Sequence, residues 1–177
     1  MESSLSETLT TLKTRRSCRS YLDRAVPEDI LAKIIEAGTY AATGMGKQSP
    51  IILAVTNRKV RDRLSELNAA VLGTSGDPFY GAPAVLVVLA NKAVPTFVYD
   101  GSLVMGNMMN AAAELGVSSC WIHRAKEVFE TEEGKAILRE AGVEGEYQGI
   151  GNLILGYDDH GTRSAAPRKE NYVYWVK

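Results

Sequence analysis

Apolar residues recur at three- and four-residue intervals in several stretches of the chain, which is the spacing of an amphipathic helix. Leu5, Leu9 and Leu12 mark the first of these stretches. In the second, Ile34 belongs to the apolar stripe that follows Pro27, a residue type favoured at the first helical position. The pattern predicts helices over residues 5–14, 27–43, 57–73, 94–116 and 125–142.

Shorter apolar runs of strand length separate these helices. The run "AVLVVLAN" is unbroken, which is typical of a central strand covered on both faces. The last residues, "NYVYWVK", show an alternating aromatic pattern and predict a strand that must pair within its own subunit or with a partner. The predicted strands cover residues 50–56, 84–91, 117–123, 149–157 and 171–177. Residues 1–177 are therefore expected to form a single α+β domain with about five strands.

Composition narrows the possible partners. The chain has 177 residues, 45% of them hydrophobic and 23% charged, which suffices for one core. Its net charge of −1 gives no global positive field, so neither nucleic acid nor a membrane is expected as a partner. The apolar stretch at 94–116 contains Asp100 and Glu114, which favour a buried helix over a membrane span. Without a signal-peptide pattern, and with Cys18 and Cys120 suited to free thiols, a cytoplasmic location is expected.

The stretch "TRRSCRSY" gathers three arginines directly after the first predicted helix. Arg15 and Arg19 share a face whether the segment is helical or extended, and Ser17 joins them when it is extended. Two guanidinium groups can therefore converge on one anion, and the planar fork of arginine suits phosphate oxygens. The alternative is a solvated charged surface at a helix end.

A glycine loop, "ATGMGKQSP", precedes the first predicted strand. Gly44 and Gly46 allow the backbone to approach a ligand closely, and Gln48 offers both a donor and an acceptor to an amide-edged ring. The loop is not a phosphate-binding P-loop, because GxxxxGK[ST] is absent and the loop comes before a strand. A third candidate is "APRKENY", where Arg168 and Lys169 lie at the surface unless the tail folds back to the arginine cluster.

The usual catalytic sets are sparse. His123 and His160 are the only histidines, and no GxSxG elbow is present. Cys120 and His123 would project toward opposite faces of a strand. The fragment "DDH" at 158–160 is explained equally well by turn chemistry, so no metal site is expected. Anion donors and a glycine loop without an acid/base set indicate that a bound cofactor brings the reactivity.

Five blocks, in order along the chain, resemble the nitroreductase family of FMN-dependent oxidoreductases. They are "TRRSCRSY", "AVPEDILAKIIEAGTYAATGMGKQSPIILAV", "FYGAPAVLVVLAN", "DGSLVMGNMMNAAAELGVSSCWIH" and "LILGYDDHGTRSAAPRK". The first two resemble that family's RRSxRxF and PSxxNxQPW patterns. The resemblance implies a central, mostly antiparallel sheet wrapped by helices, in an interlocked homodimer with two FMN molecules at the interface.

The resemblance also implies which residues contact the cofactor. The flavin phosphate, ribityl and pyrimidine contacts fall on Arg15, Arg16, Ser17 and Arg19. The loop along the isoalloxazine, commonly from the other subunit, falls on Met45, Gly46 and Gln48. The segment whose backbone contacts flavin N5 falls on Trp121, Ile122 and His123, and the C-terminal phosphate contact on Arg168 and Lys169. This chain departs from the family in having Gly46 where Asn is frequent and His123 where Gly is frequent.

The function implied by the resemblance is NAD(P)H-dependent reduction of nitroaromatics, quinones or similar small acceptors. Hydride passes through flavin N5 in a ping-pong scheme, so no side chain is expected to act as a catalytic acid or base. The alternatives are another flavin reaction, such as enone reduction, oxidative dehydrogenation or flavin supply, or a flavin-binding dimer without turnover. A non-flavin protein is the remaining alternative, because fold alone does not determine function.

Overall fold

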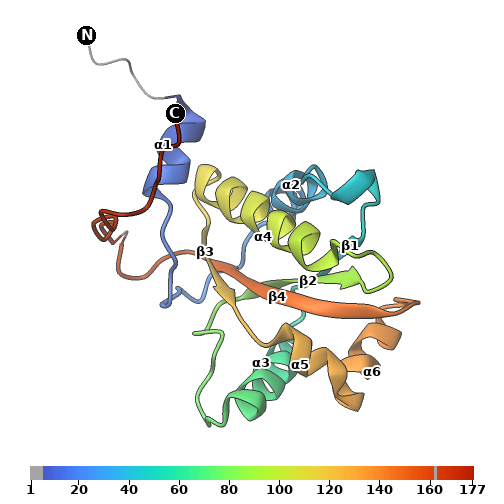
Figure 1. The fold of residues 1–177 in the computed structure, drawn as a ribbon. Coiled ribbons are helices and arrows are strands. Elements are labelled where there is room, and N and C mark those ends of the chain that lie inside the picture. Colours follow the sequence, from blue (N-terminus) through green and yellow to red (C-terminus); the bar gives the residue numbers. More distant parts are fainter. Residues whose placement is uncertain (1–5, 162) are drawn as a thin grey trace.

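The computed structural model describes residues 6–161 and 163–177 (Figure 1). Leu5, part of the predicted first helical stripe, lies outside the described residues. The helices are α1 (Glu7–Thr14), α2 (Glu28–Thr39), the short 3₁₀ helix η1 (Gly44–Gly46), α3 (Arg58–Leu72), α4 (Phe97–Glu114), α5 (Ala125–Glu130) and α6 (Glu132–Glu140). The strands are β1 (Pro50–Val55), β2 (Ala84–Asn91), β3 (Ser118–Ile122) and β4 (Tyr147–Gly156).

The four strands form one sheet in the order β1-β2-β4-β3, and every neighbouring pair is antiparallel. This confirms the predicted α+β class. Val87 of β2 pairs with Leu53 of β1 on one side and with Asn152 of β4 on the other. Strand β2 is therefore central, as its unbroken apolar sequence predicted.

Both faces of the sheet are buried beneath helices. Along β2, Leu86 and Val88 belong to a core with residues of α2 and α4, whereas Val85 and Val87 belong to a core with residues of α3, α5 and α6. Figure 1 shows these two groups of helices on opposite sides of the sheet. Each fully buried valine or leucine contributes about 1.5–3 kcal/mol of hydrophobic stabilisation. The alternation of β2 therefore stabilises both layers and fixes the position of α4.

The helix predicted over 125–142 is two helices, and this prediction was wrong. Thr131 has extended backbone angles, φ −74° and ψ 157°, and its hydroxyl accepts the Gly134 N–H at 3.0 Å as the cap of α6. A Cβ at Gly134 would lie 2.1 Å from the Val128 carbonyl oxygen, so the two helices approach closely at the break. Thr131 is a good N-cap, and this local hydrogen bond overrides the continuous helical pattern. Helix α2 likewise ends early, at Thr39 rather than residue 43.

The predicted fifth strand is absent from the sheet within the described residues. The segment 172–176 makes no strand pairing there, and its side chains are exposed, with Trp175 at 81% and Val176 at 99%. Figure 1 shows this C-terminal segment on the same side of the molecule as α1, away from the sheet. The prediction of five strands was therefore wrong for the isolated chain.

Asp77 anchors the loop that leads into β2. Its carboxylate accepts hydrogen bonds from Arg61 Nη2 at 2.6 Å and from the Ser65 hydroxyl. The backbone N–H groups of Phe79 and Gly81 each donate to it at 2.8 Å. Burial works to raise the pKa of Asp77, but these hydrogen bonds outweigh it and hold the pKa below its ordinary value.

Asp77 should therefore make stability sensitive to acid. Since its folded pKa lies below the unfolded value of about 3.9, its contribution is present above that pH and is lost as the pH falls through the folded value. In urea titrations from about pH 7 to about pH 3, Asp77→Asn should be less stable at neutral pH by about 1–2 kcal/mol and lose less on acidification. Asp23→Asn, whose side chain is 98% exposed, is the control and should follow the wild type. If Asp77→Asn had the same stability as the wild type at neutral pH and the same loss of stability in acid, this stabilising role of Asp77 would be contradicted.

Candidate functional site

The arginine segment lies beside the edge strand β3. The backbone becomes extended at Arg15, directly after α1, where φ is −52° and ψ is 133°. Ser17 forms a parallel bridge with Ser119, and the Cys18 N–H donates to the Ser119 carbonyl at 3.0 Å. A second bridge joins Tyr21 to Asp158, just beyond β4. The extended conformation considered for this segment is therefore the one adopted.

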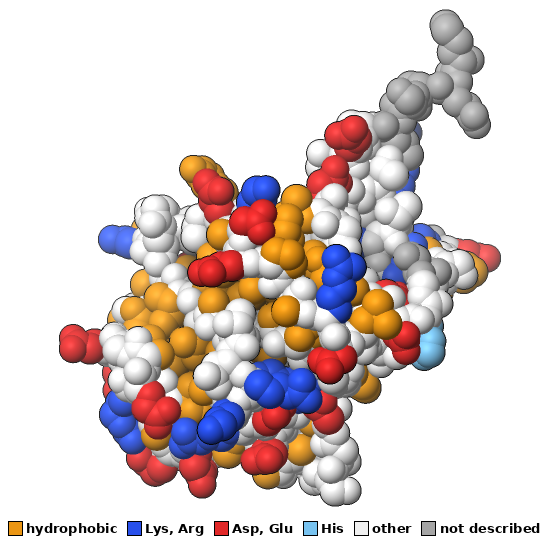
Figure 2. All heavy atoms as spheres, turned by 180° about the vertical axis from the view of Figure 1, so that it is seen from behind, with side chains coloured by type: hydrophobic (Ala, Val, Ile, Leu, Met, Phe, Trp, Pro, Cys, Tyr) orange, Lys and Arg blue, Asp and Glu red, His pale blue; other side chains and the backbone are white. Residues whose placement is uncertain are grey.

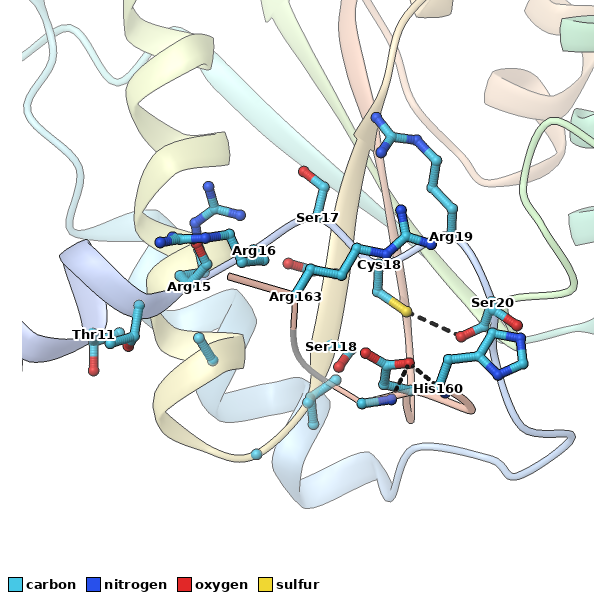
Figure 3. Close-up of a pocket in the computed structure, with 17 residues that line it drawn as sticks. Thr11, Arg15, Arg16, Ser17, Cys18, Arg19, Ser20, Ser118, His160 and Arg163 are labelled. Carbon is cyan, nitrogen blue, oxygen red and sulfur yellow. Dashed lines mark hydrogen bonds between the residues drawn. The ribbon is translucent and has the colours of Figure 1, made fainter. Parts of the chain in front are cut away.

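A cavity of about 310 Å³ opens over this segment (Figure 3). Its walls come from α1, the end of α4, the start of β3 and the turn that follows β4. Four predicted cofactor-binding residues line it, namely Arg15, Arg16, Ser17 and Arg19. The structure thus brings the whole predicted cluster to one cavity.

Two arginine donors in this cavity are buried without a partner. Arg15 Nη1 and Arg16 Nε are inaccessible to solvent and have no hydrogen-bond acceptor among the described residues. Arg16 Nη1 donates to the backbone carbonyl of Arg15 at 2.5 Å, which orients the Arg16 side chain. None of the lining arginines forms an ion pair with a carboxylate in the described part of the chain. Since buried polar groups are nearly always satisfied, these donors fit a bound anion.

The acid that lines the cavity, Asp158, accepts hydrogen bonds from the backbone of its own turn. One of its carboxylate oxygens accepts the backbone N–H groups of His160 at 2.8 Å and Gly161 at 3.1 Å. These contacts define a local turn, the chemistry expected for "DDH". Among the described residues, no group of histidine, cysteine or acidic side chains could hold a metal ion. Four arginines and one aspartate line the cavity, so it is positively charged.

The basic residue that the C-terminal segment contributes to the cavity lining is Arg163, which the sequence analysis did not name. Arg163 lines the cavity, and Figure 3 shows its side chain extending toward Cys18 and Arg19. Arg168 does not line the cavity: its Nε and Nη2 donate to the Ala166 carbonyl at 3.3 and 2.7 Å. Lys169 lies 5.2 Å from the ring centroid of Tyr172. In the sequence, the basic pair Arg168 and Lys169 after a proline was the stronger signal. Arg163 carried no signal for a binding role beyond its charge.

The glycine loop has an unusual backbone. Met45, Gly46 and Gln48 have φ values of 52°, 63° and 47°, all in the left-handed region. That region costs a non-glycine residue roughly 1–2 kcal/mol, so Met45 and Gln48 need other contacts to hold them there. Both side chains are exposed, Met45 at 80%. The loop thus exposes the apolar side chain of Met45 and the amide side chain of Gln48 at the surface, where a ligand can contact them.

The end of β3 carries the third group of predicted residues. Trp121 is half-buried, and a Cβ at Gly151 would lie 2.4 Å from its indole Nε1, so the glycine makes room for the ring. Ile122 is buried and His123 is exposed. Arg124 follows with φ 75°, a left-handed angle that turns the chain sharply into α5.

Two buried asparagines hold this turn, and the sequence analysis did not identify them. Asn68 and Asn152 are 0% and 1% exposed. Their side-chain amides donate to the His123 carbonyl at 2.8 and 3.4 Å, and Asn152 also reaches the Ile122 carbonyl at 3.4 Å. Nothing in the local sequence around Asn68 in α3 or Asn152 in β4 indicates that these side chains contact the end of β3. The convergence fixes the backbone at 122–123.

The structure does not bring the glycine loop to the arginine cavity. The loop contacts Asp100 in the first turn of α4, whereas Ala113 near the end of α4 lines the cavity. At 1.5 Å per residue these two positions are about 20 Å apart along the helix axis. Figure 1 shows η1 and the segment after α1 at opposite ends of α4. A ligand contacting both sets cannot do so within one chain unless it spans most of that helix.

Comparison with known proteins identifies the fold and the family. The family model described as "Nitroreductase family" matches residues 12–76. A protein of Archaeoglobus fulgidus, provisionally named NADH dehydrogenase/NAD(P)H nitroreductase, is 30% identical over 77% of this chain and 76% of its own length. A protein of Methanothermobacter thermautotrophicus with the same provisional name is 30% identical over 65% of this chain and 60% of its own length.

A solved structure agrees with these relatives. The crystal structure of a nitroreductase with bound FMN from Bacteroides fragilis superposes with a TM-score of 0.89 at 27% identity. The match covers 98% of this chain and 100% of the other. The chain therefore belongs to the nitroreductase family and has the nitroreductase fold. No helix within the described residues is both long enough and apolar enough to span a bilayer.

Proposed function

We propose that this protein is an FMN-dependent oxidoreductase that uses NAD(P)H to reduce small acceptors such as nitroaromatics or quinones. The observation that carries the proposal is the pair of buried, unpartnered donors, Arg15 Nη1 and Arg16 Nε, in the positively charged cavity. Family membership and the FMN-bound relative from Bacteroides fragilis supply the identity of the anion. An FMN phosphate carries about two negative charges and three acceptor oxygens, which matches the unused donors.

Each group of site residues has a role in this proposal. Arg15, Arg16 and Ser17 hold the phosphate, and Arg163 adds positive charge from the segment after β4. FMN supplies, when bound, the acceptance and donation of hydride at N5. Arg19 or Lys47 stabilises negative charge at the pyrimidine edge, and a positive group placed there in advance costs no reorganisation.

The asparagine-held backbone supports the ring end of the cofactor. The carbonyls of Ile122 and His123 are occupied by Asn68 and Asn152, so the direction of the neighbouring N–H groups is fixed. A fixed N–H can meet a ring nitrogen without the entropy loss of ordering a loop. With the cofactor held in this way, the exposed His123 ring would lie beside the reactive edge and would limit the space open to acceptors.

A homodimer completes the proposed site. Because the glycine loop and the arginine cavity lie at opposite ends of α4, we propose that each flavin contacts the loop of the partner subunit. Figure 2 shows hydrophobic side chains gathered on the face opposite to that of Figure 1. Strand β1 is an edge of the sheet, and an alternating apolar segment such as 172–176 from a partner could extend it to five strands.

The first test is the colour of the protein. The purified protein should be yellow, should release FMN on denaturation, and should be bleached by NADH or NADPH without oxygen. A spectrophotometer and mass spectrometry of the released cofactor suffice. A colourless protein that FMN cannot reconstitute would sink the proposal. A yellow protein that neither nicotinamide bleaches would contradict the reductase activity and favour flavin binding without turnover.

The second test is the oligomeric state. By light scattering the wild type should have about twice the chain mass of 19.2 kDa. Removing residues 171–177 should shift it toward the monomer and weaken flavin retention, because the proposed fifth strand and its apolar contacts are lost. Removing Lys177 alone is the matched control and should change neither property. A flavin-loaded monomer in the wild type would refute the shared site.

A further inference from the structure

Asp100 is a buried carboxylate that no cation neutralises within the described residues. It lies in the first turn of α4 and is 2% exposed. Burying a charge is costly unless hydrogen bonds compensate. Burial works to raise the pKa of Asp100, but hydrogen bonds from Ser49, Gly44 and Thr96 outweigh it and hold the pKa below its ordinary value. The N-terminal end of α4 also favours the charged form.

Two of these three hydrogen bonds tie both ends of the glycine loop to α4. Oδ1 of Asp100 accepts the Gly44 N–H at 2.9 Å, and Oδ2 accepts the Ser49 hydroxyl at 2.7 Å. Thr96 donates to the same Oδ2 at 3.1 Å. Gly44 opens the loop and Ser49 closes it directly before β1. The packing is tight, since a Cβ at Gly44 would lie 2.2 Å from Thr96 Oγ1.

The loop between these two anchors is strained and has little else to hold it. Met45 and Gln48 adopt left-handed angles that non-glycine residues disfavour, and both are exposed. The local hydrogen bonds run from Gly46 and Lys47 back to Thr43 and Gly44, and from Gln48 N–H to the Thr43 hydroxyl. These bonds close the turn on itself and do not attach it to the rest of the protein. Asp100 attaches both ends of the loop, and at Ser49 a second attachment exists, because the Asn91 N–H of β2 donates to the Ser49 carbonyl at 2.9 Å.

We propose that Asp100 is a positioning residue that latches the loop 44–49 in the strained conformation that presents Met45 and Gln48 to a ligand. It acts through the loop and touches neither cofactor nor substrate. The inference rests on the proposed function for the identity of the ligand, which is the flavin ring, but the latch itself is a property of this chain.

The latch is tested first by hydrogen exchange in the full-length protein without added flavin. Asp100→Ala should raise the exchange rates of the amides at 44–49 by about tenfold or more, because the loss of hydrogen bonds to a buried charge favours local opening. Asp100→Asn should restore most of the protection, since its Oδ1 can still accept from Gly44 and its amide can donate to Ser49. Ser49→Ala removes one anchor only and gives an intermediate result if Asp100→Ala does not fold. Unchanged exchange at 44–49 in both Asp100→Ala and Ser49→Ala would overturn the latch.

The control is Asp29→Asn, an aspartate in the first turn of α2 whose side chain is 71% exposed. The amides at 44–49 should exchange at the wild-type rate in this variant. That result would separate the latch from a general effect of removing a charge at a helix end.

Flavin binding forms the second arm. Asp100→Ala should lower the binding affinities for FMN and for riboflavin by the same factor, about tenfold, because the loop contacts the ring and not the phosphate in this proposal. The ratio of the two affinities should therefore stay unchanged. A loss for FMN alone would overturn the assignment of the loop to the ring. If the wild type bound no flavin, the proposed function would fail while the exchange result still decided the latch.

Discussion

The length and burial of α4 set the geometry on which the rest of the site depends. The helix packs beneath α2 and against the sheet through Met105 and Met108, both fully buried, so it can neither bend nor slide freely. Its first turn holds the glycine loop through Asp100, and its last turn forms a wall of the arginine cavity. The two halves of the site are thus held about 20 Å apart by one rigid element. The proposal that a second copy of the chain completes the site rests on this separation.

Buried arginine donors occur in two different settings in this protein, one that stabilises the fold and one that fits a ligand. Arg61 is 4% exposed and donates to the Ala82 carbonyl and to two carboxylates, those of Asp62 and Asp77. It is satisfied within the chain and stabilises the loop before β2. Arg15 and Arg16 also bury donors, yet the chain provides them with no acceptor among the described residues. Unpaired buried donors reduce folding stability, so their presence points to a ligand.

Local patterns predicted most of the fold but fewer of the contacts between segments. Helix α3 follows its pattern closely, from the Asn57 cap to Gly73 in the left-handed conformation at its end. The break at Thr131 was missed because a threonine cap and a mid-helix threonine look alike in sequence. The arginine cluster was found because its members are adjacent, whereas Arg163, Asn68 and Asn152 act across long separations. The predicted C-terminal strand does not form in the single chain, where the segment 172–176 lies away from the sheet and pairs with neither edge strand.

The most direct measurement compares the affinities of FMN and riboflavin for the apoprotein, since the two ligands differ only in the phosphate. If Arg15 and Arg16 are the phosphate contacts, FMN should bind at least about 100-fold more tightly, because two charge-assisted contacts contribute roughly 1.5–3 kcal/mol each. The preference should largely disappear in the double variant Arg15→Ala/Arg16→Ala and persist in Arg139→Ala, a change on α6 outside the cavity. Equal affinities of the wild type for FMN and riboflavin would contradict the account.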